Sequence, residues 1–428
     1  MIIINKRNLF FLISVWLLST LLSAQNVTIS TPHTQLLLSV PNGGTPEQLY
    51  YGSRTSDADI RSICETARRR NAYPVYGMGY PCETALSVRH ADGNLTLQMA
   101  VIGVKETRLT KENATLTVIE LKDKVYPFFV NICYKAWQDA DVIETWTEIR
   151  HEEKKPVILS KYASSMLHLN SSKYFLTEFS GDWAHEANVT ERELAFGKKV
   201  IDTKLGARAN MFVSPFFQLA LDNPSQENAG EVLVGTIGWT GNFRFTFEVD
   251  NKNELRIISG INPYDSEYSL PAKEVFRTPD FYFTYSTQGK GEASRSFHDW
   301  ARNHQVKKGN ETRMTLLNNW ESTYFDFDEN KLIGLMDEAT KLGVDMFLLD
   351  DGWFANKYPR SSDHQGLGDW EETAGKLPNG VGRLVEEAHK KGIKFGIWIE
   401  PEMVNPKSEL YEKHKDWVIH LPNRDEYY

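Results

Sequence analysis

The stretch that most constrains the fold is residues 346–354, which read MFLLDDGWF. Four consecutive apolar residues predict a strand that is covered on both faces, as in a parallel sheet beneath helices. The strand runs directly into two carboxylates, Asp350 and Asp351. Barrels of alternating strands and helices place their active sites at such C-terminal strand ends. The stretch therefore predicts a barrel strand with functional groups at its end.

The two consecutive aspartates need a turn to act together. On a regular strand, Asp350 and Asp351 would point to opposite faces, so both reach one ligand only if the strand stops and Gly352 turns the chain. We therefore interpret the pair as two carboxylates that together accept hydrogen bonds from the hydroxyl groups of one ligand. The alternative is that Asp350 caps a following helix and Trp353 is a packed aromatic residue.

Strands and helices alternate throughout the chain after about residue 312. Such alternation predicts a parallel sheet. A complete (β/α)8 barrel takes about 250 residues, whereas 115 residues run from Met314 to Tyr428. We therefore expect residues 313–428 to form the first three units of a TIM (β/α)8 barrel that is truncated in this chain. The predicted strands are residues 314–317, 346–349 and 393–399, and the predicted helices are residues 328–342, residues 380–391 and a third from about residue 407.

The preceding part of the chain consists of short alternating runs. Residues 95–101, 115–121 and 142–149 alternate apolar and polar side chains between turn residues, which predicts antiparallel strands. Many such strands without intervening helices predict a β-sandwich over residues 26–290. Residues 291–312 show helical spacing and then polar residues, which predicts a linking helix and linker. The expected fold is multidomain, with a large antiparallel β-sandwich followed by an incomplete TIM (β/α)8 barrel.

Residues 1–24 have the pattern of a secretory signal peptide. Lys6 and Arg7 supply the charged start, residues 9–22 form the apolar run, and a small-residue cleavage site precedes Gln25. The apolar run is short for a membrane span. We therefore expect a secreted or periplasmic protein that makes no membrane contact after cleavage. The three cysteines are an odd set at irregular spacing, which suggests neither a disulfide framework nor a metal site.

Acidic and aromatic side chains follow all three predicted barrel strands. Carboxylates accept hydrogen bonds from sugar hydroxyls and indoles cover the apolar face of a pyranose ring, so the pattern predicts a carbohydrate enzyme. The net charge of −9 is spread without long runs, which argues against a nucleic-acid binder. On spacing alone, Asp350 and Glu400 are candidates for the paired carboxylates of a glycosidase. The three groups are Asn319, Trp320 and Glu321; Asp350, Asp351 and Trp353; and Trp398, Glu400 and Glu402.

Seven motifs resemble those of the microbial α-galactosidases of glycoside hydrolase family 36. The four motifs in the predicted barrel are specific to that family in this order, and the other three resemble signatures of its N-terminal β-supersandwich. The resemblance runs from about residue 26 to residue 428. The motifs are residues 318–325 (NNWESTYF), 349–354 (LDDGWF), 367–370 (LGDW), 395–404 (FGIWIEPEMV), 175–183 (FLTEFSGDW), 238–242 (GWTGN) and 276–279 (FRTP).

The resemblance implies a retaining hydrolase that removes terminal non-reducing α-linked galactose without a metal or other cofactor. By analogy the two consecutive aspartates hold the galactose O4 and O6 hydroxyls, Trp320 walls the same subsite and Trp398 packs beside the ring. Asp369 and Trp370 shape the rim of the subsite from the loop after the second predicted strand. The family's nucleophile lies in a Lys-Trp-Asp motif after strand four and its acid/base lies near strand six. Neither motif occurs here, so we expect no catalytic residue before residue 428, which argues against Glu400 as a catalyst. The expected substrate-binding residues are Trp320, Asp350, Asp351, Trp398, Asp369 and Trp370.

Two other functions stay open on the sequence. One is activity on α-N-acetylgalactosaminides, and the other is a non-catalytic galactose-binding or interaction protein. Residues 76–83 match a loop that reaches a neighbouring subunit in many members of the resembled family, but they lack its Asp and Arg. The contacts of a homo-oligomer are therefore left open.

Overall fold

The structure is a computed structural model that describes residues 25–424. The chain divides into two compact units, residues 1–310 and residues 311–428. Within the described range, no helix is long and apolar enough to cross a membrane. The predicted signal peptide lies outside the described residues.

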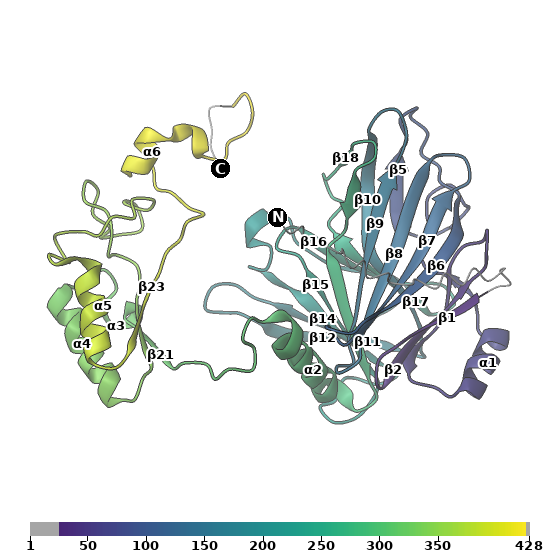
Figure 1. Ribbon diagram of the computed structural model, residues 1–428, viewed down its shortest axis with the longest axis horizontal. Coiled ribbons are helices and arrows are strands. Elements are labelled where there is room, and N and C mark those ends of the chain that lie inside the picture. The colour runs from purple at the N-terminus through teal and green to yellow at the C-terminus, as the bar shows by residue number, and fades with distance from the viewer. Residues whose placement is uncertain (1–24, 425–428) are drawn as a thin grey trace, which may run out of the picture. The chain divides into compact units, whose positions relative to one another are not determined.

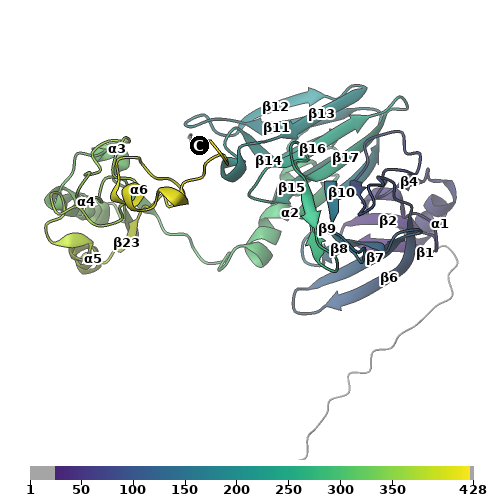
Figure 2. The ribbon, with the colours of Figure 1, turned by 90° about the horizontal axis from the view of Figure 1, so that it is seen from above.

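The first unit is built from antiparallel sheets of four, six and ten strands within the described range (Figures 1 and 2). The four-stranded sheet contains β1 (Gln25–Ser30), β2 (Thr34–Val40), β3 (Glu47–Ser53) and β4 (Arg70–Asn71). The six-stranded sheet contains β13 (Gly197–Asp202), β16 (Phe243–Val249), β17 (Glu254–Ile261), β10 (Val157–Asn170), β18 (Tyr268–Leu270) and β5 (Leu86–Arg89). The ten-stranded sheet contains β12 (Asn188–Glu193), β11 (Tyr174–Ser180), β14 (Val213–Leu221), β15 (Val232–Gly238), β20 (Asp280–Ser286), β9 (Ile143–His151), β8 (Phe128–Trp137), β7 (Ala114–Asp123), β6 (Met99–Leu109) and β19 (Val275–Arg277).

Aromatic rings join the two larger sheets face to face. Phe217 on β14 and Phe281 on β20 belong to the ten-stranded sheet, and Phe245 on β16 belongs to the six-stranded one. All three are fully buried, and the ring of Phe245 lies 5.2 Å from that of Phe217 and 6.1 Å from that of Phe281. Edge-to-face contacts of this kind add to the free energy of burial. The predicted antiparallel sandwich is confirmed.

Two helices accompany the sheets of the first unit. Helix α1 (Asp57–Thr66) begins at Ser56 with a reciprocal capping box to Asp59, and none of its residues is buried. Helix α2 (Gly289–Trp300) packs on the ten-stranded sheet, where the ring of Trp300 lies 4.4 Å from that of Tyr282 on β20. The chain continues as a short π-helix at Ala301–Gln305.

The strand predicted at residues 95–101 is wrong over its first half, because β6 begins at Met99. The backbone before that point does not continue the ladder with β7 and bonds instead to a loop and to the side chain of Asp123 at the end of β7. Leu97 donates its N–H to the carbonyl of Tyr76 at 2.8 Å, and Gln98 donates its N–H to the carboxylate of Asp123. Alternation alone cannot reveal this, because a side chain can be buried under a loop as well as in a sheet.

The second unit alternates strands and helices around a three-stranded parallel sheet in the order β21, β22, β23. This agrees with the expected start of a barrel, although two strands are shorter than predicted. The elements are β21 (Leu316–Asn318), α3 (Trp320–Thr323), α4 (Glu329–Lys341), β22 (Met346–Leu349), α5 (Gly380–Lys390), β23 (Lys394–Ile397) and α6 (Glu409–Lys413), with a 3-10 turn at Lys415–Trp417.

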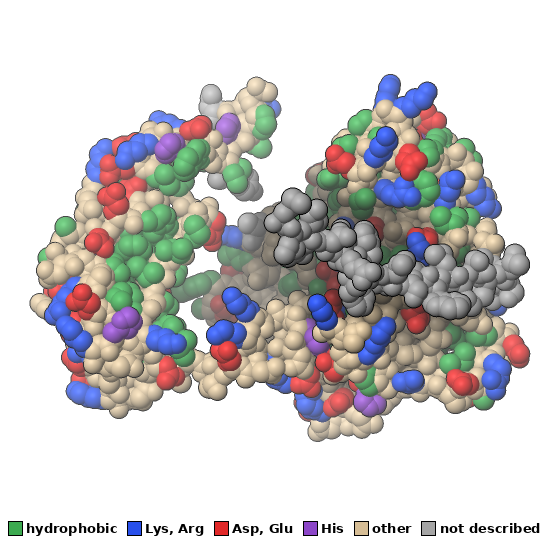
Figure 3. All heavy atoms as spheres, in the orientation of Figure 1, with side chains coloured by type: hydrophobic (Ala, Val, Ile, Leu, Met, Phe, Trp, Pro, Cys, Tyr) green, Lys and Arg blue, Asp and Glu red, His purple; other side chains and the backbone are tan. Residues whose placement is uncertain are grey.

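Helical spacing builds the core of this unit. Leu332, Met336 and Ala339 lie along one side of α4 and are completely buried together with Phe347 and Leu349 of β22. Other apolar side chains of the unit remain exposed, among them Leu316 on β21 and Ile397 on β23, and Figure 3 shows hydrophobic side chains gathered on one face. In a closed barrel, strand side chains of this kind fill the interior.

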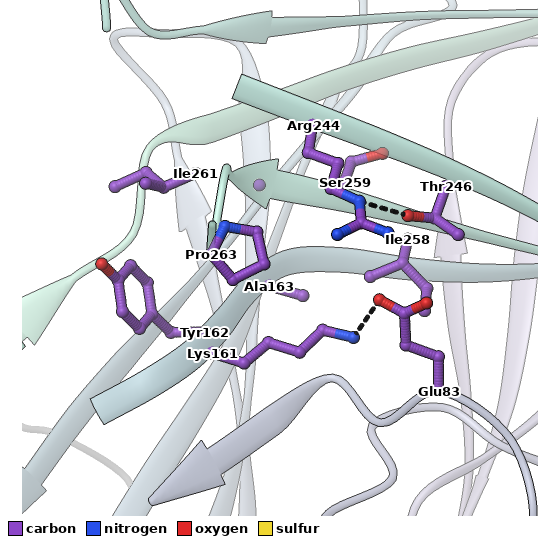
Figure 4. Close-up of a pocket in the computed structure, with 11 residues that line it drawn as sticks. Glu83, Lys161, Tyr162, Ala163, Arg244, Thr246, Ile258, Ser259, Ile261 and Pro263 are labelled. Carbon is purple, nitrogen blue, oxygen red and sulfur yellow. Dashed lines mark hydrogen bonds and ion pairs between the residues drawn. The ribbon is translucent and has the colours of Figure 1, made fainter. Parts of the chain in front are cut away.

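A partly buried ion network lies in the first unit beside a cavity of about 20 Å³, which has room for about one water molecule (Figure 4). Glu83 accepts hydrogen bonds from Lys161 at 2.5 Å and Lys198 at 2.8 Å. Burial alone would raise the pKa of Glu83, but the two ammonium groups together lower it to about 2. Burial also lowers the pKa of Lys161, which reduces the net gain from the pair.

We predict that Glu83→Gln destabilises the first unit by about 2 kcal/mol at pH 7, because it leaves the mostly buried ammonium group of Lys161 without its carboxylate. The depressed pKa means that the contribution is complete above about pH 4.5 and is lost as the pH falls toward about 2. Urea unfolding of both proteins should therefore give a difference that shrinks below pH 4.5. Glu267→Gln, which breaks a 3.8 Å pair with Arg89 at an exposed position, is the matched control. A difference that does not change with pH would contradict the prediction.

Candidate functional site

The C-terminal ends of the three parallel strands meet at one edge of the sheet. Asn318 on β21 pairs with Leu348 on β22, and Leu349 pairs with Ile397 on β23. Beyond the last paired residue, Trp398 still donates its N–H to the carbonyl of Leu349 at 2.8 Å. The polar and aromatic residues that follow each strand are thus brought to the same edge.

Asp350 is held by the end of the neighbouring strand. Its N–H donates to the side-chain oxygen of Asn319 at 2.8 Å, and its carboxylate accepts from the side-chain amide of Asn318 and from the N–H of Asp351. Asn319 is completely buried and Asp350 is half-buried. The next helix along the chain is α5, so the alternative that Asp350 caps a following helix is wrong.

Asp351 is buried and ion-paired. Its side chain is 8% exposed, and its two carboxylate oxygens accept from Nε of Arg360 at 2.9 Å and from Nη2 at 2.7 Å. The chain turns immediately afterwards at Gly352, whose φ is +98°. This turn meets the condition under which both aspartates can reach one ligand, although they sit in different surroundings.

The indoles form a cluster on one side of the edge. The ring of Trp370 lies 6.2 Å from that of Trp353 and 6.4 Å from that of Trp398, and Trp353 donates Nε1–H to the carbonyl of Trp398 at 3.0 Å. Trp353 is buried, whereas Trp370 and Trp398 are half-buried. Trp353 therefore packs, and the two others offer part of their rings.

Trp320 is linked to the Asp351–Arg360 pair through the ring of Phe325. Its ring lies 4.9 Å from that of Phe325, over which the guanidinium of Arg360 lies at 5.6 Å. Trp320 is half-buried. Trp320, Asp351 and Trp398 are thus gathered at the same edge of the sheet, as one sugar subsite would require.

Asp369 has a structural role that the sequence did not reveal. Its two carboxylate oxygens accept from the N–H groups of Glu409 and Leu410, each at 2.9 Å, at the start of α6. A carboxylate at a helix N-terminus satisfies donors that have no partner within the helix. Its expected place at the sugar rim stays a prediction.

Sequence reasoning missed three residues that hold the site together. They are Arg360, Lys376 and Asn405, and all three lie in irregular segments. The only signal was the presence of three cations, Lys357, Arg360 and Lys376, in the long loop after two consecutive carboxylates. Among the described residues, no group of three or more His, Cys, Asp or Glu side chains is placed to hold a metal ion.

Comparison with known proteins identifies the family. The family model described as the glycosyl hydrolase family 36 N-terminal domain matches residues 44–271, more than half of the chain. This chain belongs to glycoside hydrolase family 36. The model described as Melibiase matches residues 275–428. The resemblance drawn from the sequence motifs is confirmed.

The relatives of this family 36 chain are α-galactosidases. The α-galactosidase Mel36A of Lactobacillus acidophilus is 31% identical over 91% of this chain and 57% of its own length. AgaA of Geobacillus stearothermophilus is 34% identical over 73% of this chain and 42% of its own length. The chain thus spans about half the length of these relatives. Neither of the two alternative functions finds support in them.

Solved structures of family 36 enzymes share the fold. The α-galactosidase from Lactobacillus brevis superposes with a TM-score of 0.85 and 28% identity, covering 94% of this chain and 58% of its own. The A355E variant of AgaA in complex with 1-deoxygalactonojirimycin gives a TM-score of 0.88 and 28% identity, covering 94% and 60%. Relative to these structures, this chain comprises the N-terminal sandwich and the first part of the catalytic domain.

We predict that Gly352→Ala destabilises the second unit by about 1 kcal/mol more than Gly343→Ala. Both glycines have positive φ, so alanine is strained at either position. A Cβ at Gly352 would also lie 3.0 Å from the ring of Phe325, whereas a Cβ at Gly343 meets nothing within 4 Å. Chemical unfolding of the two variants measures the difference. Equal losses would show that the turn between the aspartates and the aromatic residues is not tightly packed.

Proposed function

We propose that the protein to which this chain belongs hydrolyses terminal non-reducing α-D-galactosyl residues by a retaining mechanism. The observation that carries the proposal is the pair of consecutive aspartates at the end of β22, gathered with partly exposed indoles at one sheet edge. Carboxylates accept from sugar hydroxyls and indoles cover the C–H face of the ring. The α-galactosidase relatives support the same reaction.

The proposed division of roles follows the surroundings of each residue. Asp350 and Asp351 accept hydrogen bonds from the O4 and O6 hydroxyls of galactose, and Trp320 walls the same subsite. Trp398 packs beside the sugar ring, and Trp370 shapes the rim of the subsite. Asp369 contributes from the loop after β22, where its contacts to α6 hold the neighbouring segment in place.

We further propose that these residues bind the sugar but do not break the glycosidic bond. A retaining mechanism needs a nucleophile and an acid/base about 5 to 5.5 Å apart. The motifs that the family resemblance implies for them match nothing in residues 1–428. Hydrolysis then requires groups that these 428 residues do not supply, and we expect this chain alone to be inactive.

The proposed substrates are α-galactosyl oligosaccharides. AgaA variants have been crystallised in complex with raffinose and with stachyose. Both sugars end in an α-linked galactose, which the hydroxyl grip of this chain suits. The assay that tests the proposal is release of nitrophenol from nitrophenyl α-galactoside by the complete protein that contains this chain. Absence of turnover would refute it.

We predict that Asp350→Asn lowers kcat/KM for the nitrophenyl α-galactoside about 100-fold in that protein. The change replaces a charged acceptor by an amide that cannot serve two donors equally, and hydrogen bonds to charged groups are the stronger ones. Asp337→Asn, which loses a partly exposed ion pair to Lys391 on the helix surface, serves as the control and should keep its activity. Full activity of Asp350→Asn would rule out the hydroxyl-gripping role.

We also propose that the protein is exported to the periplasm or the medium. The support is the charge, apolar run and cleavage site of residues 1–24. N-terminal sequencing of the protein recovered from its native host should start at Gln25. A mature protein that retains Met1 would contradict export by this signal.

A further inference from the structure

We propose that Arg360 is a positioning residue for the hydrolysis, fixing the carboxylate of Asp351 in the orientation that receives a galactose hydroxyl. The inference rests on the proposed function, and it adds a residue outside the motifs that carry the family resemblance. Arg360 lies in the irregular loop after β22 and is 3% exposed. A guanidinium buried this deeply needs partners on all of its N–H groups.

The contact between the two side chains is a two-point fork. Nε donates to Oδ1 of Asp351 at 2.9 Å and Nη2 donates to Oδ2 at 2.7 Å. The side chains are 4% and 8% exposed. Two parallel bonds fix the rotation of a carboxylate as well as its position, which a single bond does not.

The fork leaves Asp351 able to bind a sugar. An ionised carboxylate has about four lone-pair sites on its two oxygens. Arg360 occupies one site on Oδ1, and on Oδ2 it makes the 2.7 Å bond from Nη2 and a longer 3.1 Å contact from Nε, which is shared with Oδ1. The remaining sites can accept hydroxyl protons. The guanidinium therefore orients the carboxylate and compensates its burial without replacing the sugar as a partner.

Arg360 is itself held from the loop after β23. Its Nη1 donates to the carbonyl of Gln365 and to the side-chain oxygen of Asn405, each at 3.1 Å. The same Asn405 oxygen accepts from the N–H of Leu367 at 3.0 Å. The orientation of Asp351 is thus coupled to a segment that begins next to Trp398.

Lys376 is a second cation that holds the segments around Asp351 in place. Its ammonium group donates to the carbonyls of Phe325 at 2.8 Å, Gly352 at 2.9 Å and Arg360 at 3.2 Å. Burial lowers the pKa of Lys376, an effect that the charge of Asp351 opposes. The two cations together connect segments that follow β21, β22 and β23.

A purely structural function would not need these charges. Ion pairs that are buried can often be replaced by apolar side chains of similar volume without loss of stability, because the desolvation cost offsets the attraction. A buried, oriented carboxylate is useful where a ligand must meet an acceptor that is already in place. The pair follows β22 at the same sheet edge as Trp320 and Trp398, which gives it that use under the proposed function.

The test is a double-mutant cycle on kcat/KM for nitrophenyl α-galactoside, using the complete protein that contains this chain. The proteins are wild type, Asp351→Asn, Arg360→Ala and the double variant. If Arg360 acts through Asp351, Arg360→Ala costs about 100-fold on its own but less than about 3-fold in the Asp351→Asn background. Losses that multiply would overturn the proposal, because they would mean that the two residues act independently.

A substrate readout separates positioning from loss of fold. The 4-deoxy and 6-deoxy analogues of the same galactoside reveal which hydroxyl Asp351 receives. Arg360→Ala and Asp351→Asn should lose discrimination against the same analogue, whereas general damage would lower activity on all three substrates equally and would refute the role. Arg383→Ala, which breaks a partly exposed pair with Glu387 on α5, is the matched control and should behave as wild type.

Two further results, a variant that does not fold and a wild type without activity, also have defined meanings. If Arg360→Ala does not fold, the cycle is repeated with Arg360→Lys, which keeps the charge but cannot form the fork. It should retain most of the stability and lose at least 10-fold in kcat/KM, and full activity would refute the need for the fork. A wild-type protein without activity refutes the proposed function itself, whereas an active wild type with a failed cycle refutes only the role of Arg360.

Discussion

The buried charge of Asp351 is the constraint on which the candidate site depends. A carboxylate removed from water costs several kcal/mol unless a cation and further hydrogen bonds compensate it. Arg360 supplies the cation, and its own remaining donors must then be satisfied by Gln365 and Asn405. One desolvated group thereby orders segments that follow two strands. The irregular backbone at this end of the sheet is specified by that requirement rather than by secondary structure.

The two neighbouring aspartates are made unequal by their surroundings. The guanidinium of Arg360 fixes Asp351. The carboxylate of Asp350 instead accepts from the side-chain amide of Asn318 and from the N–H of Asp351, and the N–H of Asp350 donates to the side chain of Asn319. Asp350 is also more exposed. One carboxylate is thus oriented by a guanidinium, while the other is held by neutral amide groups. Parallel pairing produces this arrangement, because it brings the ends of adjacent strands together, which antiparallel hairpins do not.

Much of the fold could be predicted from the sequence, because it follows from local patterns. The apolar run of residues 346–349, the spacing along α4 and the alternation in the sandwich each report burial of a regular element. The prediction of a strand at residues 95–98 failed because this part of the chain is held by a loop and a carboxylate. The same limit applies to the site. Arg360 meets Asp351 within a loop, and Asp369 accepts from the first N–H group of a helix 40 residues later in the chain. Neither contact has a periodic signature.

The proposed function separates the residues that bind the sugar from the groups that break the glycosidic bond, and this separation has a kinetic consequence. Interactions with the galactose hydroxyls that are equally strong in the substrate and in the transition state lower KM without raising kcat. These interactions increase the rate only where they hold the sugar ring in the orientation that a nucleophile can attack, because the binding energy then offsets the entropy lost in orienting the ring. Using binding energy in this way requires that the residues around Asp351 hold its carboxylate rigidly, since a mobile carboxylate would bind the sugar in several orientations. Under the proposed function, the catalytic value of the two aspartates therefore depends on the rigidity of their surroundings as much as on their chemistry.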